Sequence, residues 1–171
     1  MPVCVQESLT APAPPVVEIR RFRPGDEAAF LRLNEEWIVR HFVLEEKDRT
    51  VLNDPMKHIL DRGGQILFAV IGGEAVGCCA IVPELEPGVY EVAKMAVTEK
   101  LQGQGIGRKI LQAVIETAKG MGASRLYLET NSKLANATHL YEKLGFRHVP
   151  VERLKPSLYR RADVFMEMVL S

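Results

Sequence analysis

This sequence lacks long apolar runs and an excess of either charge, and it contains few cysteines. No apolar stretch among its 171 residues approaches the roughly 20 that a membrane-spanning helix needs, so we expect no contact with a membrane. Lysine plus arginine and aspartate plus glutamate number 22 each, and this balance argues against nucleic acid as a partner. A hydrophobic fraction of 47% in a chain of this length instead predicts one globular domain.

The cysteines, Cys4, Cys78 and Cys79, lack the paired spacing of a zinc site or of a disulfide framework. We expect free thiols in a reducing compartment, with Cys78 and Cys79 on opposite faces of a core strand. The four histidines show no metal-ligand spacing, so we expect no metal. Because the first residues contain no basic segment followed by an apolar core, the sequence predicts a cytoplasmic location.

Proline spacing separates a tail from the ordered part of the chain. Residues 1–16 include Pro12, Pro14 and Pro15 and predict a disordered tail, so the expected single domain spans residues 17–171. Within it, runs rich in β-branched residues predict strands at 16–22, 65–71, 74–82, 89–97, 124–130, 147–151 and 163–170. Gly72 and Gly73 suit the tight turn of a hairpin between two of these strands.

Helical spacing of apolar residues predicts four helices. They are listed in chain order: from a cap at Asp26, from a cap at Asp54 to Gly63, from near Gln102 to Gly120 or Gly122, and from Leu134 to Leu144. The second would bury Met56, Ile59 and Leu60. The order β-α-α-β-β-β-α-β-α-β-β predicts an α/β fold in which a mixed, largely antiparallel sheet is flanked by helices on both faces.

The segment LQGQGIGRKIL places Gly103, Gly105 and Gly107 at every second position before an amphipathic helix. No Gly-Lys-Ser or Gly-Lys-Thr closes it, which excludes a P-loop, and the even spacing excludes the dinucleotide-binding fingerprint. What remains is bare backbone N–H groups at a helix N-terminus, which carries partial positive charge and suits an anion such as pyrophosphate. The alternative is a flexible turn that only lets helix and strand pack closely.

Two further motifs flank this loop. Val-Tyr-Glu-Val-Ala-Lys-Met-Ala-Val precedes Gln102-x-x-Gly105-x-Gly107, and Leu-Tyr-Glu-Lys-Leu-Gly-Phe at 140–146 follows it. Together they resemble the GCN5-related N-acetyltransferase (GNAT) family. The resemblance implies acetyl-CoA as cosubstrate, with its pyrophosphate on the backbone of the glycine loop and its pantetheine along the splayed end of the preceding strand. The implied binding residues are Met95, Ala96, Val97, Gln102, Gly103, Gln104, Gly105, Ile106, Gly107, Arg108, Asn131 and Asn136.

A finer resemblance lies in EWIVRHFVLEEKDRTVLNDP, GGQILFAV and KMAV, which are similar to the acetyltransferase half of proteins that carry a MarR-like winged helix in front. We expect this chain to be that catalytic half alone. One position departs from the family pattern, because many members have an asparagine seven residues before the tyrosine, where this sequence has Leu134. Asn131 and Asn136 are the candidates to replace it.

Acetyl transfer to an amine needs a base, because an amine with a pKa of about 10 is mostly protonated at neutral pH. Strict alternation would place Glu91 on an apolar face with Val89, Ala93, Met95 and Val97, where burial raises a carboxyl pKa. The family resemblance also favours Glu91 as the base. The alternatives are a bulge that turns Glu91 to solvent, an ion pair with Lys94 or an arginine, and a water chain acting as base.

The departing sulfur needs a proton, and the resemblance places Tyr141 beside it as the acid. A packing role is the alternative for this tyrosine. A backbone N–H near 95–97 is the implied donor to the acetyl carbonyl oxygen.

The acceptor is less sharply indicated. Residues 26–48 are rich in acidic side chains and residues 147–162 in basic ones. An acidic lip at Glu45, Glu46 and Asp48 would attract a cationic amine. A carboxylate of the acceptor would bind one of the basic residues Arg153, Lys155, Arg160 and Arg161. The alternative is that both segments are ordinary solvated faces.

We therefore expect an N-acetyltransferase that moves the acetyl group of acetyl-CoA directly to a primary amine of a small molecule, such as an amino acid or a polyamine. Acetylation of a protein lysine or N-terminus, and a binding module that senses acetyl-CoA without turnover, are the alternatives. Edge strands near the C-terminus favour a homodimer.

Overall fold

The computed structural model describes residues 15–171, so most of the predicted tail, and Cys4 with it, lies outside the described residues. The strands are β1 (Glu18–Arg21), β2 (Gln65–Ile71), β3 (Glu74–Pro83), β4 (Val89–Val97), β5 (Arg125–Thr130), β6 (Arg147–His148) and β7 (Val164–Val169). The α-helices are α1 (Glu27–His41), α2 (Glu46–Asn53), α3 (Ile106–Gly120) and α4 (Ala135–Leu144). Shorter turns are the π-helical η1 (Met56–Leu60) and the 3-10 segments η2 (Glu99–Leu101) and η3 (Val151–Arg153).

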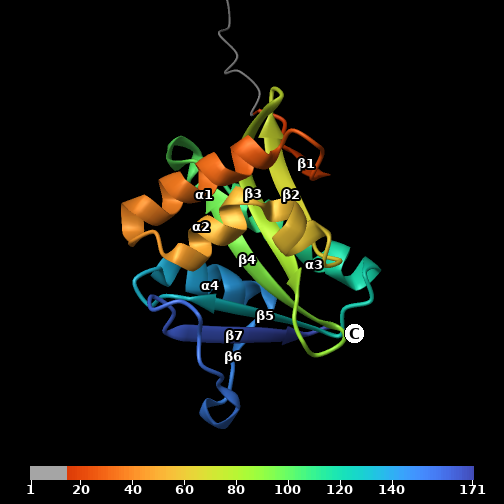
Figure 1. Ribbon diagram of the computed structural model, residues 1–171, viewed down its shortest axis with the longest axis vertical. Helices are drawn as coiled ribbons and strands as arrows, with labels where there is room; N and C mark the ends of the chain where they lie inside the picture. The colour runs from red at the N-terminus through yellow and green to blue at the C-terminus, as the bar shows by residue number, and fades with distance from the viewer. Residues whose placement is uncertain (1–14) are drawn as a thin grey trace, which may run out of the picture.

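The seven strands form one sheet in the order β1-β2-β3-β4-β5-β7-β6 (Figure 1). Every neighbouring pair is antiparallel except β4 with β5, which is parallel. This confirms the predicted mixed, largely antiparallel sheet and the predicted order of elements. The bounds of β2 and β4 are those predicted, and the turn at Gly72 and Gly73, both with positive φ, ends β2.

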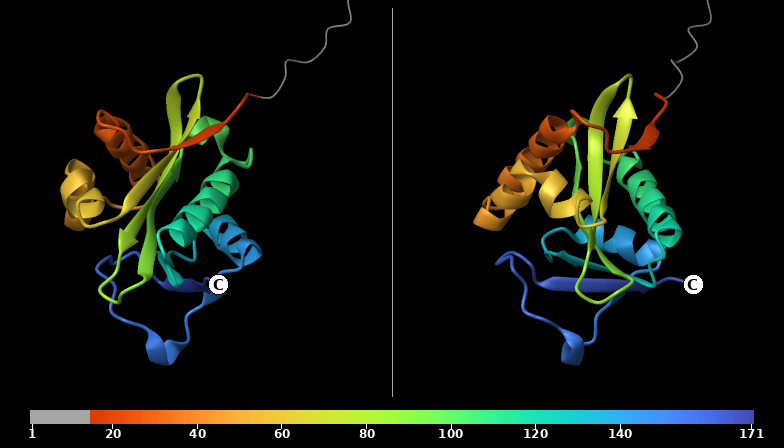
Figure 2. Two further views of the ribbon diagram at one scale, coloured as in Figure 1. Left: turned by 90° about the vertical axis from the view of Figure 1, so that its right-hand side faces the viewer. Right: turned by 45° about the vertical axis from the view of Figure 1, so that its right-hand side comes forward.

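Helices cover both faces of the sheet, as Figure 2 shows for α1 and α2 on one side and α3 on the other. One core lies under α1 and α2 and includes Phe30, Leu33 and Phe68. The other lies under α3 and α4 and includes Ile110 and Leu126. Two faces must therefore be apolar along the central strands, which is why β2 is buried almost throughout.

Cys78 and Cys79 are free, fully buried and divided between the two cores, as expected for neighbours on a strand. Burial raises the pKa of the Cys78 thiol to about 12. Both side chains therefore pack as small apolar groups.

The helical predictions between residues 26 and 63 need correction. Asp26 does not cap α1 with its side chain; its carboxylate accepts hydrogen bonds from Arg20 at 2.7 and 3.0 Å and from the Arg23 N–H at 2.6 Å. The predicted helix up to Gly63 is only the five-residue turn η1, in which Ile59 is buried but Met56 is exposed.

The helix α2 was missed altogether. It is a polar helix whose buried side chains are Leu52 and Asp48, so its sequence carries no apolar period. Its N-terminus is held instead by a reciprocal capping box between Glu45 and Asp48, in which the Glu45 N–H donates to the Asp48 carboxylate at 2.9 Å. A capping box and one buried leucine thus stabilise this helix, which has no apolar periodicity to reveal it in the sequence.

A bulge interrupts β4 at Lys94, whose φ of 54° is positive. Ala93 lies opposite Ala80, and Ala96 lies opposite Cys78, so Lys94 and Met95 together oppose one residue of β3. Beyond Ala93 the alternation therefore changes phase: Met95 packs on the α3 side, whereas Ala96 belongs to the core under α1. The prediction that Glu91 shares one face with Met95 and Val97 is wrong for this reason.

Candidate active site

The site begins where β4 and β5 part. These strands pair only from Val89 opposite Arg125 to Glu91 opposite Tyr127, and from there they diverge. Within the part of the chain that the structure describes, the backbone of 92–97 therefore forms no ladder with β5, although the Gln102 side-chain amide donates to the Val97 carbonyl at 3.2 Å. Unpaired strand backbone that is not solvated needs hydrogen bonds from another source, such as an extended ligand.

Two cavities meet at this point. The α3 cavity, of about 630 Å³, lies at the N-terminus of α3; the α2 cavity, of about 760 Å³, lies beside α2 and opens toward the loop after β3 and residues 149–159. Five residues line both: Glu91, Ala93, Lys94, Glu129 and Tyr159. Glu91 thus lies on the boundary between two separate binding spaces.

The α3 cavity gathers most of the predicted cofactor residues. Those lining it are Met95, Ala96, Val97, Gln102, Gly103, Gly105, Ile106, Gly107, Arg108, Asn131 and Asn136. Gln104 is the exception, because it is exposed and does not line the cavity. Trp37 and Ile38 of α1 and Phe42, which follows it, also line the cavity, although sequence inspection did not propose them as site residues.

The three glycines of the loop have different tasks. Gly103 and Gly105 adopt φ values of 79° and 80°, which side chains rarely tolerate, and Gly105 stands at the N-cap of α3. Gly107 has ordinary backbone angles, but a Cβ there would lie 3.0 Å from the Met95 methyl carbon. The loop is therefore both a conformational turn and a close packing contact, and it presents the first N–H groups of α3 to the cavity.

Tyr141 also lines the α3 cavity, and only 9% of its surface is exposed. Its ring packs edge-on against Phe146 with the centroids 5.9 Å apart, and the turn at Gly145 orders both residues because the Phe146 N–H donates to the Tyr141 carbonyl at 3.0 Å. Burial raises the pKa of the phenol, which keeps it protonated. Within residues 15–171 the hydroxyl has no hydrogen-bond partner, so it is available to a ligand.

Glu91 faces the α2 side of the sheet together with Ala93. Burial raises the pKa of its carboxyl to about 8, and the negative charges of Glu129 and Glu84 add to this effect, whereas Lys94 opposes it. A carboxyl that titrates close to neutral pH can accept a proton from an amine and release it again.

The two asparagines that were candidates to replace a family residue differ. Asn131 donates from its amide to the Arg161 carbonyl at 2.6 Å and accepts from the Lys133 N–H at 2.8 Å, so its polar groups already hold the turn before α4. Asn136 is exposed in the first turn of α4, after Leu134, which forms no side-chain cap.

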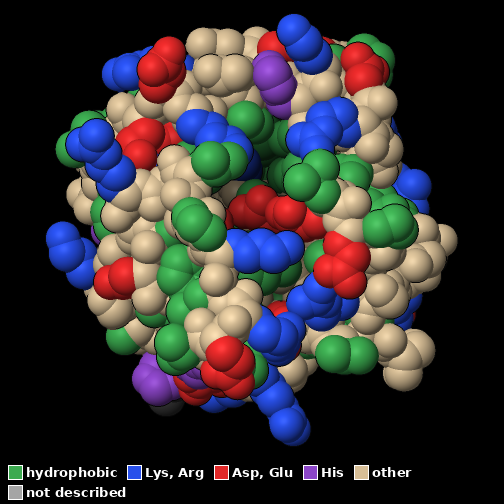
Figure 3. Space-filling model, turned by 60° about the horizontal axis from the view of Figure 1, so that its bottom comes forward, with side chains coloured by type: hydrophobic (Ala, Val, Ile, Leu, Met, Phe, Trp, Pro, Cys, Tyr) green, Lys and Arg blue, Asp and Glu red, His purple; other side chains and the backbone are tan. Residues whose placement is uncertain are grey.

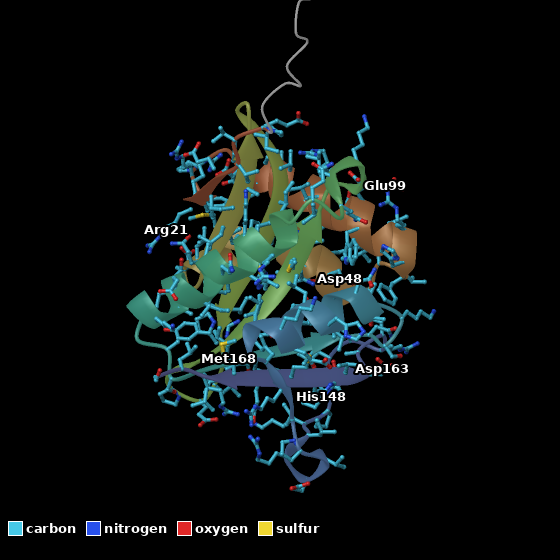
Figure 4. All side chains as sticks on the ribbon, turned by 180° about the vertical axis from the view of Figure 1, so that it is seen from behind. Arg21, Asp48, Glu99, His148, Asp163 and Met168 are labelled. Atoms are coloured by element: carbon cyan, nitrogen blue, oxygen red, sulfur yellow. The ribbon has the colours of Figure 1, made fainter. Side chains whose placement is uncertain are left out.

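The predicted acidic lip is wrong for Asp48, whose side chain is fully buried near the middle of the molecule (Figure 4). It accepts hydrogen bonds of 2.7 Å from Lys94 and from both terminal nitrogens of Arg161. Burial would raise its pKa, but the hydrogen bonds from Arg161 and Lys94 outweigh burial and lower it to about 2. Arg161 is thus committed to Asp48 and, at 3.1 Å, to Glu45, and is not a free carboxylate receptor.

The acidic and basic segments contact each other, so they are not two separate solvated faces. The Arg160 N–H also donates to Glu45, at 3.1 Å, and Lys94 donates to the Tyr159 hydroxyl at 2.8 Å. Sequence inspection missed Lys94 and Tyr159 as site residues. The opposite charge of the two segments was a signal for the contact that contains Tyr159, but no signal marked Lys94, which lies outside both segments.

Among residues 15–171, none of the helices combines the length and the apolar character needed to cross a bilayer. The same residues hold no group of three His, Cys, Asp or Glu side chains arranged for a metal ion.

Comparison with known proteins decides the family. The model of the acetyltransferase (GNAT) family matches residues 27–146. This chain belongs to the GNAT family. It is 32% identical over 145 residues to the uncharacterized N-acetyltransferase YjgM of Escherichia coli (strain K12), covering 81% of this chain and 86% of that protein. The GNAT protein is thus an acyltransferase, as the loop and the tyrosine motif predicted.

Solved structures agree on the fold. The acetyltransferase of GNAT family from Staphylococcus aureus Mu50 gives a TM-score of 0.81 at 22% identity, over 91% of this chain and all of that one. The protein yncA of Salmonella typhimurium, solved with its cofactor acetyl-CoA, gives 0.71 at 24% identity, over 91% and 94% of the two chains. The GNAT fold, with β4 and β5 at its centre, is therefore established for this chain.

Proposed function

We propose that this GNAT protein moves the acetyl group of acetyl-CoA directly to the primary amine of a small molecule. The meeting of two cavities at Glu91 carries the proposal, because a thioester in one cavity and an amine in the other would come together at their shared boundary. A direct transfer needs both partners in place at once, and the total space suits two ligands.

The residues of the α3 cavity fit acetyl-CoA. Backbone N–H groups from Gln102 to Gly107 would hold the pyrophosphate at the positive end of α3, and the unpaired backbone of 95–97 would bind the pantetheine amides. When bound, acetyl-CoA supplies an activated acetyl group. Asn131 and Asn136 line the same cavity beside α4.

The roles of the catalytic residues follow from their surroundings. Glu91 would take a proton from the acceptor ammonium, either directly or through a water. Tyr141 would donate its phenolic proton to the departing sulfur, and a backbone N–H near the Lys94 bulge would stabilise the carbonyl oxygen. Each group lies on the α3 cavity or on the boundary between the cavities.

Thiol release tests the proposal. Acetyl-CoA should raise the melting temperature, and a panel of amino acids, polyamines and peptides should contain an amine that releases free CoA thiol. Stabilisation without thiol release from any amine would instead identify a sensor, and release with peptides alone would identify a protein acetyltransferase. If acetyl-CoA gives no stabilisation and no amine gives turnover, the proposal fails.

Three further expectations from the sequence, on the fusion resemblance, the homodimer and the location, stay predictions. The finer resemblance to the acetyltransferase half of MarR-like fusions predicts catalysis by this domain alone. A homodimer through edge strands predicts twice the monomer mass in light scattering. A cytoplasmic location predicts that fractionated cells retain the protein with cytoplasmic markers.

A further inference from the structure

The floor of the α2 cavity is one face of the splayed sheet. Tyr127 lies opposite Glu91 in the parallel pair, and Glu129 is two residues further along β5, so all three side chains share this face. The alternate residues Leu126 and Leu128 are buried in the core on the other side. The strands therefore present carboxylates to an enclosed space rather than to open solvent.

At one end of this floor the charges neutralise one another. Arg125 donates to Glu167 at 3.0 Å and to Glu86 at 2.6 Å, and Arg153 also pairs with Glu167. These ion pairs leave no net charge for a ligand. The Lys94 ammonium is also committed, because it faces Asp48.

The other end carries three carboxyl groups whose charges Lys94 and Lys47 offset only in part. Glu84, Glu91 and Glu129 line the cavity, and none of them forms an ion pair within residues 15–171. Burial raises the pKa of Glu129 as well as that of Glu91, although a hydrogen bond from Ser157 at 3.3 Å partly offsets this. Carboxyl groups that repel one another in this way are stabilised when a cation enters.

Basic and apolar side chains complete the lining. Lys47, His58, Arg62 and Lys155 line the cavity without an ion pair in the described part of the chain. Leu85, Leu154 and Leu158 line it too, and Leu85 is 97% exposed. Figure 3 looks onto this face and shows acidic side chains deep in a hollow, with basic and apolar ones around them.

We propose that the acceptor is an amphoteric amine: a primary ammonium that binds at Glu84, Glu91 and Glu129, and a carboxylate that binds Arg62 or Lys155, joined by an apolar body. This rests on the proposed function and names its substrate class. A polyamine is disfavoured, because its second cation would face the basic side chains. In the reaction, the bound ammonium first loses one proton to Glu91, and the free amine then attacks, so that the nitrogen–acetyl bond forms and the carbon–sulfur bond breaks. The departing sulfur takes a proton from Tyr141, and the second proton that the nitrogen loses restores the phenol.

Matched amines test the class directly. We would compare L-leucine, L-leucinamide, 3-methylbutylamine and spermidine by kcat/KM for thiol release, each over its full pH profile so that differences in amine protonation are accounted for. Leucine should exceed leucinamide and 3-methylbutylamine by about tenfold or more, the effect expected from one lost charge-assisted hydrogen bond. Spermidine should be the poorest of the four.

Single-site variants locate the carboxylate. Arg62→Gln and Lys155→Gln both remove an exposed charge, and at least one should raise the KM for leucine about tenfold while leaving leucinamide unchanged. Arg21 is an exposed residue of β1 at the edge of the molecule (Figure 4) and lines neither cavity. The control variant Arg21→Gln should therefore leave the KM for leucine and the KM for leucinamide unchanged. Retained stabilisation by acetyl-CoA would show that each variant is folded.

The outcomes separate two failures. Equal turnover of leucine and its amide, or preferred turnover of spermidine, would overturn the amphoteric acceptor while supporting amine acetylation. Thiol release from none of these amines or of the wider panel would overturn the proposed function itself.

Discussion

The Lys94 ammonium donates a 2.7 Å hydrogen bond to the Asp48 carboxylate, and both side chains are buried. This pair joins α2 to the bulge of β4, and Arg161 brings the segment before β7 to the same carboxylate. Lys94 and Arg161 also lie over the ring of Tyr159, each 4.5 Å from its centroid. Three segments far apart in the chain are thus tied together at the boundary of the two cavities.

Asp48→Asn should destabilise the protein by about 3–5 kcal/mol, because it leaves the buried Lys94 ammonium without a counter-charge and leaves Arg161 with Glu45 alone. Lys94→Met should cost less, since Asp48 keeps its two hydrogen bonds from Arg161. Urea unfolding measures both. Glu116→Gln in the exposed pair with Lys119 serves as control and should change stability by less than about 1 kcal/mol. A loss for Asp48→Asn no larger than that control would contradict a structural role for the pair.

Tyr141→Phe should lower kcat by about a hundredfold or more while the affinity for acetyl-CoA changes little. The ring contact with Phe146 survives the change, so the melting temperature should stay the same. Thiol release gives kcat and calorimetry gives the affinity. Equal losses in the two would indicate that the hydroxyl holds the cofactor and is not the acid.

The activity should rise with pH through about 8, because Glu91 acts as a base only when it is ionised and its surroundings raise its pKa to that range. Glu91→Gln should remove this ascending limb from the profile of kcat/KM. Glu74→Gln, an exposed position at the start of β3, is the control and should keep it. An unchanged limb in Glu91→Gln would favour a water chain without this carboxyl, or the amine itself, as the titrating group.

The titration of Glu91 should also affect stability, but in the opposite direction: the free energy of unfolding should fall with rising pH where the activity rises. Since the folded pKa of Glu91 lies above its ordinary value of 4.5, the folded state holds more protons than the unfolded state between pH 4.5 and about 8. The free energy of unfolding of the wild type should therefore fall across that window relative to Glu91→Gln. Chemical unfolding at several pH values measures this difference, and parallel curves would show that Glu91 is not perturbed.

Gly105→Ala should cost about 1–2 kcal/mol of stability and weaken acetyl-CoA binding, because alanine must adopt a left-handed backbone at the N-cap of α3. Gly120→Ala, at the far end of the same helix, meets open space at an ordinary φ and should be neutral or slightly stabilising. Denaturant unfolding and calorimetry compare the two. Similar effects at both positions would show that the backbone angle at Gly105 does not matter.

Local patterns in the sequence were enough to predict most of the framework. Runs rich in β-branched residues predicted β2 and β4, and helical spacing with the glycine loop predicted α3. The glycine spacing of the loop and the strand around Glu91 are short-range features that the sequence shows directly, whereas the family resemblance pointed to Tyr141. The structure then brought Glu91 and Tyr141 to one cavity.

Long-range contacts decided the rest. The α2 helix has too few apolar residues to show a period, and the bulge at Lys94, which changes the face of every later residue of β4, depends on pairing with β3. The composition of residues 26–48 and 147–162 shows that the two segments carry opposite charge. Only tertiary packing determined that Asp48 pairs with Lys94 and Arg161 inside the protein. The sequence by itself determined most of the strands, the helices α1, α3 and α4 and the place of the glycine loop, since those depend on neighbours a few residues apart. The tertiary structure alone decided which charges are buried and paired and which stay without an ion pair within residues 15–171, because burial and pairing join residues that the sequence keeps far apart.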